Sequence, residues 1–425
     1  MTTTSHEPGV GARHMKVTIL TGGRDSHYAL PLVASLSAQP TQIDVICSEE
    51  FPVERIATVP NVRHLLFYRL NAKGVPSYQK VLRLIATYLR LLAYAVRTDS
   101  RIFHILWQTR FEYVDTLILN PMFKILGRSL VLTVHNVDAG ERDGRSSSCQ
   151  RWLLRRLYRQ MDHLFVHTQK TKEELTERFA VDRTKVTVVA FGLNTVVPES
   201  PVTRTQARQK LGLEPQEKVV LFFGHITPYK GVEYLVEAVA RLRSEGWEDL
   251  RLVIAGDVKD RAATEYYAQL LDAIDRLSIR GAISLHTDYI PDADVELYFK
   301  AADVCVLPYK LIFQSGVLFL SYRFGLPVVV SDVGSMRDDV EEGRTGFVCR
   351  PEDPASLAET LRRFFKSPLF TNAEQTRRDI RALANDRNSW STVAALTFPI
   401  YDALASRHRL GGRARLRDRS VSSPS

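Results

Sequence analysis

The sequence predicts an α/β protein built from two doubly wound domains that face each other across a cleft. Short apolar runs alternate with longer amphipathic stretches along almost the whole chain. Strands joined by helices in this way form parallel sheets with helices on both faces. The alternation stops at a polar, proline-bearing segment, residues 196–217, which indicates a linker between two domains. Because ligands of such sheets bind outside the carboxyl ends of the strands, the cleft is the expected active site.

Seven apolar runs in the first half are predicted to be buried strands. They are residues 17–20, 43–46, 62–66, 102–106, 130–134, 164–166 and 186–189. Amphipathic spacing predicts helices over residues 78–96, 114–126, 150–161 and 170–179. We therefore expect a flexible N-terminus at residues 1–14 and an N-terminal domain at residues 15–195.

Five further apolar runs predict the strands of a C-terminal domain at residues 218–385. They are residues 219–223, 252–255, 283–285, 304–307 and 328–330. A C-terminal helix is expected at residues 386–405. The last 20 residues, 406–425, hold six Arg and one Asp but few apolar residues, which predicts a disordered basic tail.

The composition excludes several classes of protein. The chain has 425 residues, 45% apolar and 25% charged, as in ordinary globular proteins. Its four cysteines stand far apart, so neither a disulfide framework nor a zinc site is expected. The chain shows no signal peptide and no membrane-spanning run, which favours a cytoplasmic protein. The charge of +9 falls to +4 without the tail (9 − 5), and no nucleic-acid motif accompanies it, so nucleic acid is not an expected partner.

Two segments of the second half have the pattern of an anion site. In the first, a predicted strand ends at Gly224, and Lys230-Gly231 follows where a helix begins. A helix start offers free backbone N–H groups and a partial positive charge, and an ammonium beside it completes a site for a diphosphate. In the second, Gln314-Ser315-Gly316 precedes an apolar helix. The alternative for the first segment is an ordinary strand-to-helix turn with a solvated lysine.

These segments carry a resemblance to a known family. The second half contains FFGHITPYKGVEYLVEA, LRLVIAGD, YIPDADVELYFKAADVCVLPY, QSGVLFLSYRFGLPVVVSDVGSM and EEGRTGFVCRPEDPASLAETL in that order. The first half contains VLTVHNV and HLFVHTQKTKEELTERFAVDRTKVTVVAFGLNT. Together they make the chain similar to the family 4 glycosyltransferases, which have two facing Rossmann-like domains, the GT-B fold. The resemblance implies an N-terminal acceptor domain and a C-terminal nucleotide-sugar domain.

The resemblance also implies roles for particular residues. Lys230 would pair with the diphosphate of a sugar nucleotide, and the amides of Ser315 and Gly316 would cap it. The loop at Tyr289 and Ile290 would lie near the base. The donor site as a whole would comprise Gly224, His225, Lys230, Gly231, Tyr289, Ile290, Gln314, Ser315, Gly316 and Val317.

The activity that the resemblance implies is transfer of the sugar with retention, without a metal or other cofactor. The acceptor would be a saccharide or a lipid-linked molecule, in polysaccharide or glycolipid biosynthesis.

The sequence departs from the family pattern at the donor site. Most members carry two Glu eight positions apart, where this chain has Ile312 and Leu320. The Arg usual in the loop before the lysine is also missing, with His225 and Thr227 in its place. Gln314 is expected to bond the sugar hydroxyls in lieu of a carboxylate. A weakened or inactive sugar-nucleotide-binding protein, or a sugar-nucleotide epimerase, therefore remains an alternative.

Three further features lie on the expected cleft or beside it. Gly22-Gly23 ends the first strand, where the backbone would let a ligand approach or simply turn. His135-Asn136 follows the strand at 130–134, so His135 is with Gln314 a candidate catalytic residue; the alternative is a histidine that bonds a loop backbone. Asp292-Ala293-Asp294 has the form of a metal motif but opens a helix, where N-capping explains it better.

Two predicted helices carry a stripe of basic residues. The stripes consist of Lys80, Arg83, Arg90 and Arg97 in one helix, and Arg151, Arg155, Arg156 and Arg159 in the other. A solvated face is one interpretation. The other is a weak contact with anionic lipid, which would place the protein on the inner face of a membrane.

Overall fold

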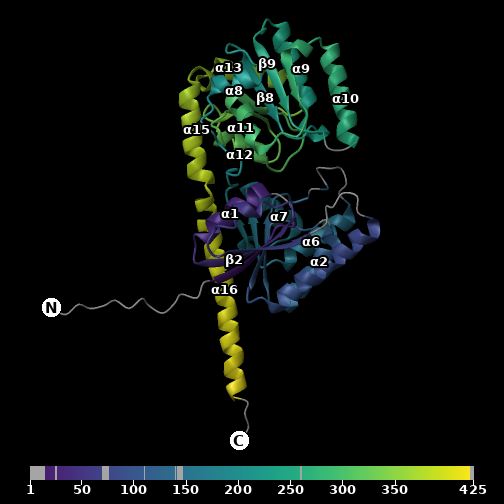
Figure 1. Ribbon diagram of the computed structural model, residues 1–425, viewed down its shortest axis with the longest axis vertical. Helices are drawn as coiled ribbons and strands as arrows, with labels where there is room; N and C mark the ends of the chain where they lie inside the picture. The colour runs from purple at the N-terminus through teal and green to yellow at the C-terminus, as the bar shows by residue number, and fades with distance from the viewer. Residues whose placement is uncertain are drawn as a thin grey trace, which may run out of the picture.

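The computed structural model describes residues 15–23, 26–68, 76–109, 111–138, 140, 147–258 and 261–421. Two parallel α/β domains lie one above the other, with the helices α15 (Ala373–Asn388) and α16 (Trp390–Val421) along one side (Figure 1). The predicted fold class is therefore confirmed. The predicted flexible N-terminus, residues 1–14, lies outside the described residues. Within the described part, no helix is both long and apolar enough to cross a bilayer.

The N-terminal sheet has, in the described residues, seven parallel strands in the order β3-β2-β1-β4-β5-β6-β7. They are β1 (Met15–Leu20), β2 (Thr41–Ser48), β3 (Val62–Tyr68), β4 (Ile102–Ile105), β5 (Ser129–Val134), β6 (His163–Val166) and β7 (Val186–Val188). All seven predicted strands are present; the sheet buries β4, β5 and β6 along their whole length, whereas the edge strand β3 is mostly exposed or half-buried. The strand order reverses at β1 and β4, so their carboxyl ends open a site for ligands.

Helices cover both faces of this sheet. One face packs on α1 (Ser26–Ser37) and on α16, which contributes Trp390 and Tyr401 to the core. The helices associated with the other face are α2 (Ser77–Arg97), α3 (Glu112–Val114), α4 (Asn120–Ile125), α6 (Ser148–Gln160) and α7 (Gln169–Phe179). The predicted helix at 114–126 is divided, because a π-helical turn, η2 (Asp115–Leu119), joins α3 to α4. Pro121 has no backbone N–H to donate there.

The C-terminal sheet has, among the described residues, six parallel strands in the order β10-β9-β8-β11-β12-β13. They are β8 (Lys218–Phe223), β9 (Leu250–Ala255), β10 (Ile283–His286), β11 (Val304–Leu307), β12 (Val328–Ser331) and β13 (Gly346–Cys349). The helices around it are α9 (Val232–Ser244), α10 (Arg261–Arg276), α11 (Asp292–Ala301), α12 (Gly316–Arg323), α13 (Pro354–Lys366) and α14 (Pro368–Thr371), with α15. The sequence did not predict β13, a four-residue strand that begins with glycine.

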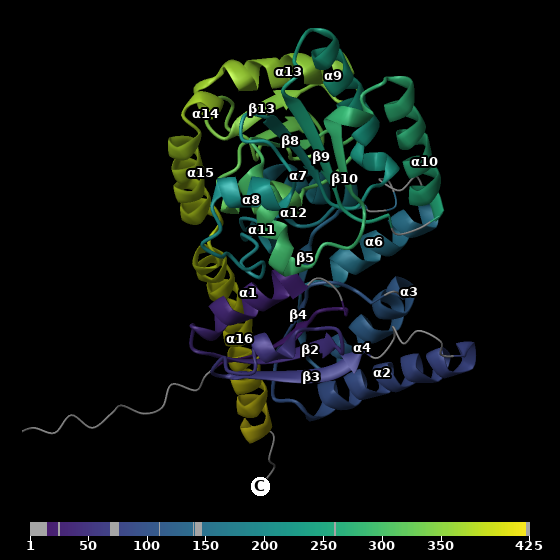
Figure 2. The same cartoon turned by 45° about the horizontal axis from the view of Figure 1, so that its top comes forward.

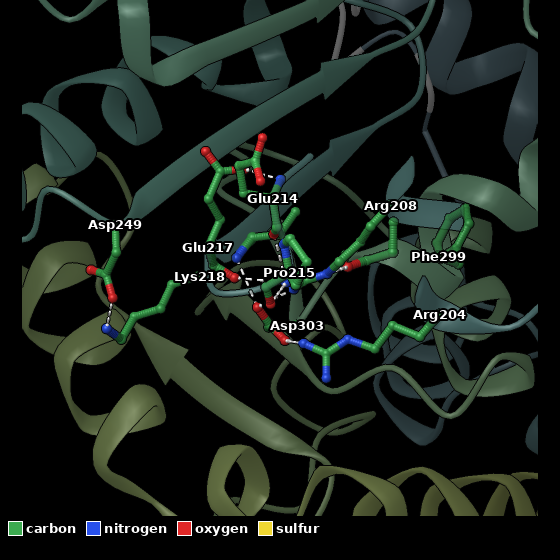
Figure 3. Close-up of polar contacts among 12 residues, drawn as sticks. Arg204, Arg208, Glu214, Pro215, Glu217, Lys218, Asp249, Phe299 and Asp303 are labelled. Carbon is green, nitrogen blue, oxygen red and sulfur yellow. Dashed lines mark hydrogen bonds and ion pairs between the residues drawn. The ribbon is translucent and has the colours of Figure 1, made fainter. Parts of the chain in front are cut away.

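The segment at 196–217, predicted to be a linker, is built into the C-terminal domain. It contains the helix α8 (Arg204–Lys210), whose Arg208 is buried against the end of the sheet. Arg208 donates to Asp303 at 3.0 Å and to the carbonyl oxygens of Pro215 and Glu217, as Figure 3 shows. Asp303 also accepts from Arg204 and from the backbone N–H of Val219. Some of the polar residues that suggested a linker, Arg204 and Arg208, therefore belong to an ionic network with the buried Asp303.

The chain crosses between the domains twice, and the two crossings lie side by side. The Leu193 N–H donates to Asn388 O at 3.0 Å, and the Asn388 amide donates to Phe191 O at 2.9 Å. The Trp390 indole N–H also donates to Leu193 O at 2.6 Å and so links the two crossing segments. The helix predicted at 386–405 thus begins at Trp390.

The prediction of a disordered tail at 406–425 requires correction. The backbone of α16 is helical as far as Val421, and residues 422–425 lie outside the described part. Arg, Ala and Leu are good helix formers, and extension of a helix already anchored in a core avoids the cost of nucleation.

The carboxyl ends of the two sheets face each other. Lys170 at the start of α7 donates through Nζ to Gly334 O, which follows β12, at 2.8 Å. Phe191 after β7 stacks on Phe319 of α12, with ring centroids 5.0 Å apart. Figure 1 shows α1 and α7 on the side of the N-terminal domain that faces α11 and α12. Loops from both sheets can therefore contribute to one site.

Candidate active site

Lys230 places a buried ammonium at the carboxyl end of the central strand β8. It ends the short turn η4 (Pro228–Lys230), and only 7% of the residue is exposed. Its Nζ lies 5.8 Å from the Phe222 ring centroid and 5.5 Å from that of Tyr309. A Cβ on Gly224 would come within 2.6 Å of Nζ, so the ammonium lies directly beside this glycine. Because a buried charge favours a partner of opposite sign, the position suits a phosphate.

The turn after Lys230 depends on a glycine. Gly231 has φ +63, and a Cβ there would clash with the Pro308 carbonyl oxygen. The loop after β8 can therefore lie against the loop after β11 only with glycine at this position. Val317 of α12 also approaches, with a methyl 3.7 Å from the Cβ position of Gly224. The two predicted anion segments thus meet.

His225 stands at one of the two positions where the family resemblance predicts an arginine. It is exposed, and its Nδ1 pairs with Asp257, which follows β9. Thr227, at the other candidate position, has a buried hydroxyl with no hydrogen-bond partner in the described part of the chain. This loop therefore offers an ionisable histidine and a hydroxyl rather than a fixed cation.

Gln314 lies between β11 and α12 and contacts a carboxyl group that the sequence did not single out. Its Nε2 donates to Asp339 Oδ2 at 3.3 Å, while its Oε1 is buried and makes no bond to any described residue. Burial raises the pKa of Asp339 to about 7, and the bond from Gln314 opposes that rise. Since Nε2 is engaged, Oε1 is the atom that can accept from a ligand hydroxyl.

Ser315 precedes α12 without capping it. Its side chain makes no cap bond and lies 3.4 Å from the Tyr309 hydroxyl instead. Only 5% of Ser315 is exposed, whereas Gly316 is open. The first N–H groups of α12 therefore have no side-chain cap, which is the arrangement that receives an anion.

His135 is held by rings on three sides. Trp107 stacks on it at 4.3 Å, and Tyr28 meets it edge-on at 4.8 Å. His167, which the sequence argument did not assign, has its Nε2 at 3.3 Å from the His135 Nδ1. Burial lowers the pKa of His135 well below its ordinary value, and burial likewise lowers the pKa of His167 to about 4. Both rings are therefore neutral at pH 7.

The hydrogen bonds fix which nitrogen of His135 is basic. The carbonyl oxygen of Val189 can only accept, so the His167 Nδ1 at 3.2 Å donates to it. The neutral His167 then accepts at Nε2, and His135 donates from Nδ1. The His135 Nε2 is left as an acceptor, and it is buried with no partner among the described residues. This tautomer follows from the bonding network.

Phe191, also missed by the sequence argument, connects the histidines to α12. Its ring lies 5.0 Å from that of His167, and a Cβ on Gly316 would be 3.9 Å from it. Its only sequence signal is its place in VVAFGLNT, directly after the last N-terminal strand. Phe191 thus spans the domain boundary beside the start of α12.

The remaining predicted residues lie at the edges of this arrangement. A Cβ on Gly22 would be 2.5 Å from Trp107 O, so glycine at this position allows the loop after β1 to pack closely on the loop after β4. Gly23 adjoins Ser48 and Tyr68, and Asn136 is half-buried. Tyr289 is 75% exposed, while Ile290 is partly buried against the C-terminal core.

Asp292 and Asp294 do not cap α11 as the sequence predicts. The N-cap residue is Pro291, and both carboxylates lie in the first turn, where the helix dipole favours them. Within the described ranges, no three His, Cys, Asp or Glu side chains are grouped to hold a metal ion.

Seven buried side-chain nitrogen or oxygen atoms make no hydrogen bond in the described part of the chain. Three of them belong to this site, namely His135 Nε2, Thr227 Oγ1 and Gln314 Oε1. Buried polar atoms are normally bonded, so these three, which lie in loops that follow β5, β8 and β11, are available to accept or donate to a ligand.

Comparisons with known proteins match both domains. Residues 26–197 match the family model described as Glycosyltransferase Family 4, and residues 217–367 match that of Glycosyl transferases group 1. The chain is 31% identical over 253 residues to the D-inositol 3-phosphate glycosyltransferase of Streptomyces avermitilis, covering 58% of this chain and 53% of that protein. It is 28% identical over 300 residues to that of Corynebacterium efficiens, covering 68% and 69%. The chain thus matches about half to two thirds of the length of these curated relatives.

Solved structures share the fold. The sucrose-phosphate synthase of Thermosynechococcus elongatus superposes with a TM-score of 0.73 at 18% identity, over 92% of this chain and 100% of that one. Anabaena Alr3699/HepE in complex with UDP-glucose superposes with a TM-score of 0.69, also at 18% identity and with the same coverage.

Proposed function

Because the chain belongs to the family 4 glycosyltransferases, we propose that it transfers a sugar from a nucleotide-diphosphate sugar to a saccharide or lipid-linked acceptor. The observation that carries this proposal is the buried Lys230 ammonium beside the uncapped start of α12. A cation and free N–H groups at the carboxyl ends of neighbouring strands are the means by which such folds hold a diphosphate.

In the proposed reaction Lys230 and the amides of Ser315 and Gly316 hold the diphosphate. The acceptor hydroxyl oxygen bonds to the anomeric carbon on the face from which the diphosphate leaves, and its proton passes to the leaving phosphate oxygen. Negative charge grows on that oxygen as the bond to carbon breaks. Groups already fixed at this position stabilise the transition state more than the ground state, and retention follows from attack on the same face.

Two neutral acceptors would orient the sugars. Gln314 Oε1 would accept from a donor hydroxyl, in the role that a glutamate has in relatives. His135 Nε2 would accept from a hydroxyl of the acceptor or of the donor sugar. Neither role requires a metal ion or another cofactor. Uridine diphosphate sugars are the first donors to test, since the Anabaena structure holds UDP-glucose.

One observation supports a second candidate function, that of a sugar-nucleotide-binding protein without turnover. Ile312 and Leu320, which stand where most relatives carry glutamate, are 8% and 6% exposed and belong to the C-terminal core. No carboxylate can therefore reach the donor from these two positions. An epimerase on the same fold would also bind the donor but would interconvert it without an acceptor.

The experiment combines calorimetry with a donor panel. Titration with uridine, guanosine and adenosine diphosphates and their sugars identifies the base, and product formation from radiolabelled donors separates the three candidates. Transfer to an added acceptor supports the transferase. Binding without turnover supports the inactive protein, and conversion of the donor alone supports the epimerase.

Membrane attachment belongs to the same proposal. A cytoplasmic transferase with a lipid-linked acceptor has to work at the inner face of a membrane. The basic stripes on α2 and α6 support such contact, because basic residues near an anionic surface contribute about 1 kcal/mol each.

A further inference from the structure

Exposed apolar side chains gather on one side of the N-terminal domain. Among the described residues, eighteen large apolar side chains are exposed, and thirteen of these lie between residues 78 and 152. Most of the thirteen belong to α2 or to the segment from Phe111 to Ile125 that contains α3 and α4. Scattered exposure needs no explanation, but a gathering of this kind marks an interaction surface.

The longest part of this surface is a stripe on α2. It comprises Tyr78, Val81, Leu82, Ile85, Leu89 and Val96, which are between 49% and 63% exposed. At 100° per residue they fall within an arc of about 100°. The side of the helix away from the stripe is buried in the domain through Thr87 and Leu91, which are 2% and 1% exposed. The stripe therefore has no partner within the described chain although the helix itself is firmly packed.

The segment beside α2 extends the surface. α2 and α4 are in contact, and the exposed residues here are Phe111, Tyr113, Leu117, Ile118, Met122 and Ile125. Ile125 is 84% exposed, the highest value among the large apolar residues of the described part. Figure 2 shows α2, α3 and α4 on the side of the domain away from α16. We call the exposed apolar residues of α2 and of the segment 111–125 the apolar face.

The charges around the apolar face are mainly basic, although the exposed Glu112 lies between Phe111 and Tyr113. α2 carries Lys80, Arg83, Arg90 and Arg97 and no acidic residue over its whole length. α6, which contacts the turn η2, carries Arg151, Arg155, Arg156 and Arg159 and again no acidic residue. An exposed apolar stripe on a helix whose polar face is basic is the pattern of a helix that lies in the interfacial layer of an anionic bilayer.

A second copy of the chain fits this face less well. The spacing of Tyr78, Leu82, Ile85 and Leu89 would also suit a helical partner. However, two copies of α2 would bring lysines and arginines together with no acidic residue to pair with them. A single partner helix would also leave the segment 111–125 uncovered.

We propose that the apolar face inserts into the interfacial layer of a membrane that contains anionic lipids, with the basic residues of α2 and α6 at the headgroups. Attachment then has an apolar part that salt does not screen, in addition to the electrostatic part. Insertion would bring the site to a membrane-embedded acceptor, a consequence that rests on the proposed transferase function. The insertion itself does not depend on that function.

A short path connects the apolar face to the candidate site. Tyr88 of α2 donates to the buried carboxylate of Asp115 at 2.7 Å and lies 3.0 Å from the Thr109 hydroxyl. Thr109 is two residues from Trp107, which stacks on His135. α2 is therefore fixed to the loop that supports the catalytic candidate, so insertion would set the height of the site above the bilayer.

The test is co-sedimentation of the full chain with vesicles of phosphatidylcholine and phosphatidylglycerol in equal parts, and with phosphatidylcholine alone, at low and high salt. The variant L82S/L89S removes apolar area without changing charge, and L277S/L396S removes two exposed leucines elsewhere as a matched control. We expect the first variant to bind the mixed vesicles at least about tenfold more weakly and to lose its salt-resistant part. The control should bind like the natural protein.

A second measurement reports how deeply α2 inserts into the bilayer. Leu89→Trp should be quenched by lipids brominated on their acyl chains, whereas Leu277→Trp should not. Undiminished vesicle binding by L82S/L89S, or absence of quenching in Leu89→Trp, would overturn the proposal. A dimer in solution that L82S/L89S converts to a monomer, with vesicle binding unchanged, would assign the face to a second copy instead. Nucleotide binding, titrated without vesicles, reports separately on the proposed function.

Discussion

The Trp107 and His135 rings stack face to face, with centroids 4.3 Å apart and planes 3° from parallel. Together with the bond from Nδ1 to His167, the stack holds the His135 ring in a fixed orientation with its Nε2 free to accept. His135→Ala should therefore lower the transfer rate while the melting temperature changes little. The measurement is activity per folded molecule beside thermal unfolding. Preserved activity with a large fall in melting temperature would show that the ring is only a packing element.

Lys230→Ala should weaken binding of a nucleotide diphosphate by roughly 1.5–3 kcal/mol, the range for hydrogen bonds to charged groups. The reason is the loss of the buried ammonium beside Gly224. Lys310→Ala is the matched control. Lys310 pairs with Glu233, so this substitution should leave the affinity for the diphosphate nearly unchanged. Equal affinities of the natural protein and Lys230→Ala in calorimetry would remove Lys230 from the phosphate site.

Gln314→Ala should depress turnover and sugar-nucleotide binding while binding of the bare nucleotide diphosphate stays nearly intact. The expectation follows from the neutral amide, whose free Oε1 suits a sugar hydroxyl rather than a phosphate. Calorimetry with each ligand on the same variant provides the comparison. Equal losses for both ligands would assign Gln314 to the diphosphate.

The Asp339 carboxyl should make stability depend on pH. Its pKa rises from an ordinary 3.8 to about 7 in the folded protein because of burial. The native state therefore binds more protons than the unfolded state between about pH 4 and 7, and the free energy of unfolding falls as pH rises through that range. Asp339→Asn, which can still accept from Gln314, should lose this part of the pH dependence. Identical slopes of melting temperature against pH in the natural protein and in Asp339→Asn would contradict this prediction.

Asp303→Asn should lower the free energy of unfolding by about 3–5 kcal/mol, because it leaves the Arg208 guanidinium buried without its counter-charge. Arg204→Gln is the control and should cost much less, since the Arg204 side chain is 35% exposed against 4% for Arg208. Denaturant unfolding measures both. A loss no larger for Asp303→Asn than for Arg204→Gln would show that the network adds little.

Most of the fold could be predicted because buried parallel strands are continuous apolar runs. The run at 328–330 is unmistakable, whereas β13 has only Phe347 and Val348 between a glycine and a cysteine and gives little signal. The segment 196–217 suggested a linker because the sequence alone does not distinguish a buried arginine, such as Arg208, from a solvated one. Its partner Asp303 is 95 residues away, and no local pattern reveals that pairing.

The candidate site was predictable where it consists of a strand end and a helix start. Lys230 and Ser315 lie where the local pattern placed them. His167, Phe191 and Asp339 were missed because each acts through a residue distant in sequence. The basic stripe on α2 was visible from spacing, but the exposure of Leu82 and Leu89 depends on which side of the helix the sheet buries.

The position of Trp390 has a consequence for the order in which the two domains can fold during synthesis. β1 leaves the ribosome before the other described strands, yet Trp390 and Tyr401, which complete the core beneath α1, are made after the second domain. The second domain draws its own core from residues 193 to 384 and can close as soon as these have emerged. A nascent chain halted before residue 390 would therefore carry a finished second domain and a first domain with one apolar face still open to water. The helix α16, made after the second domain, thus completes the N-terminal domain.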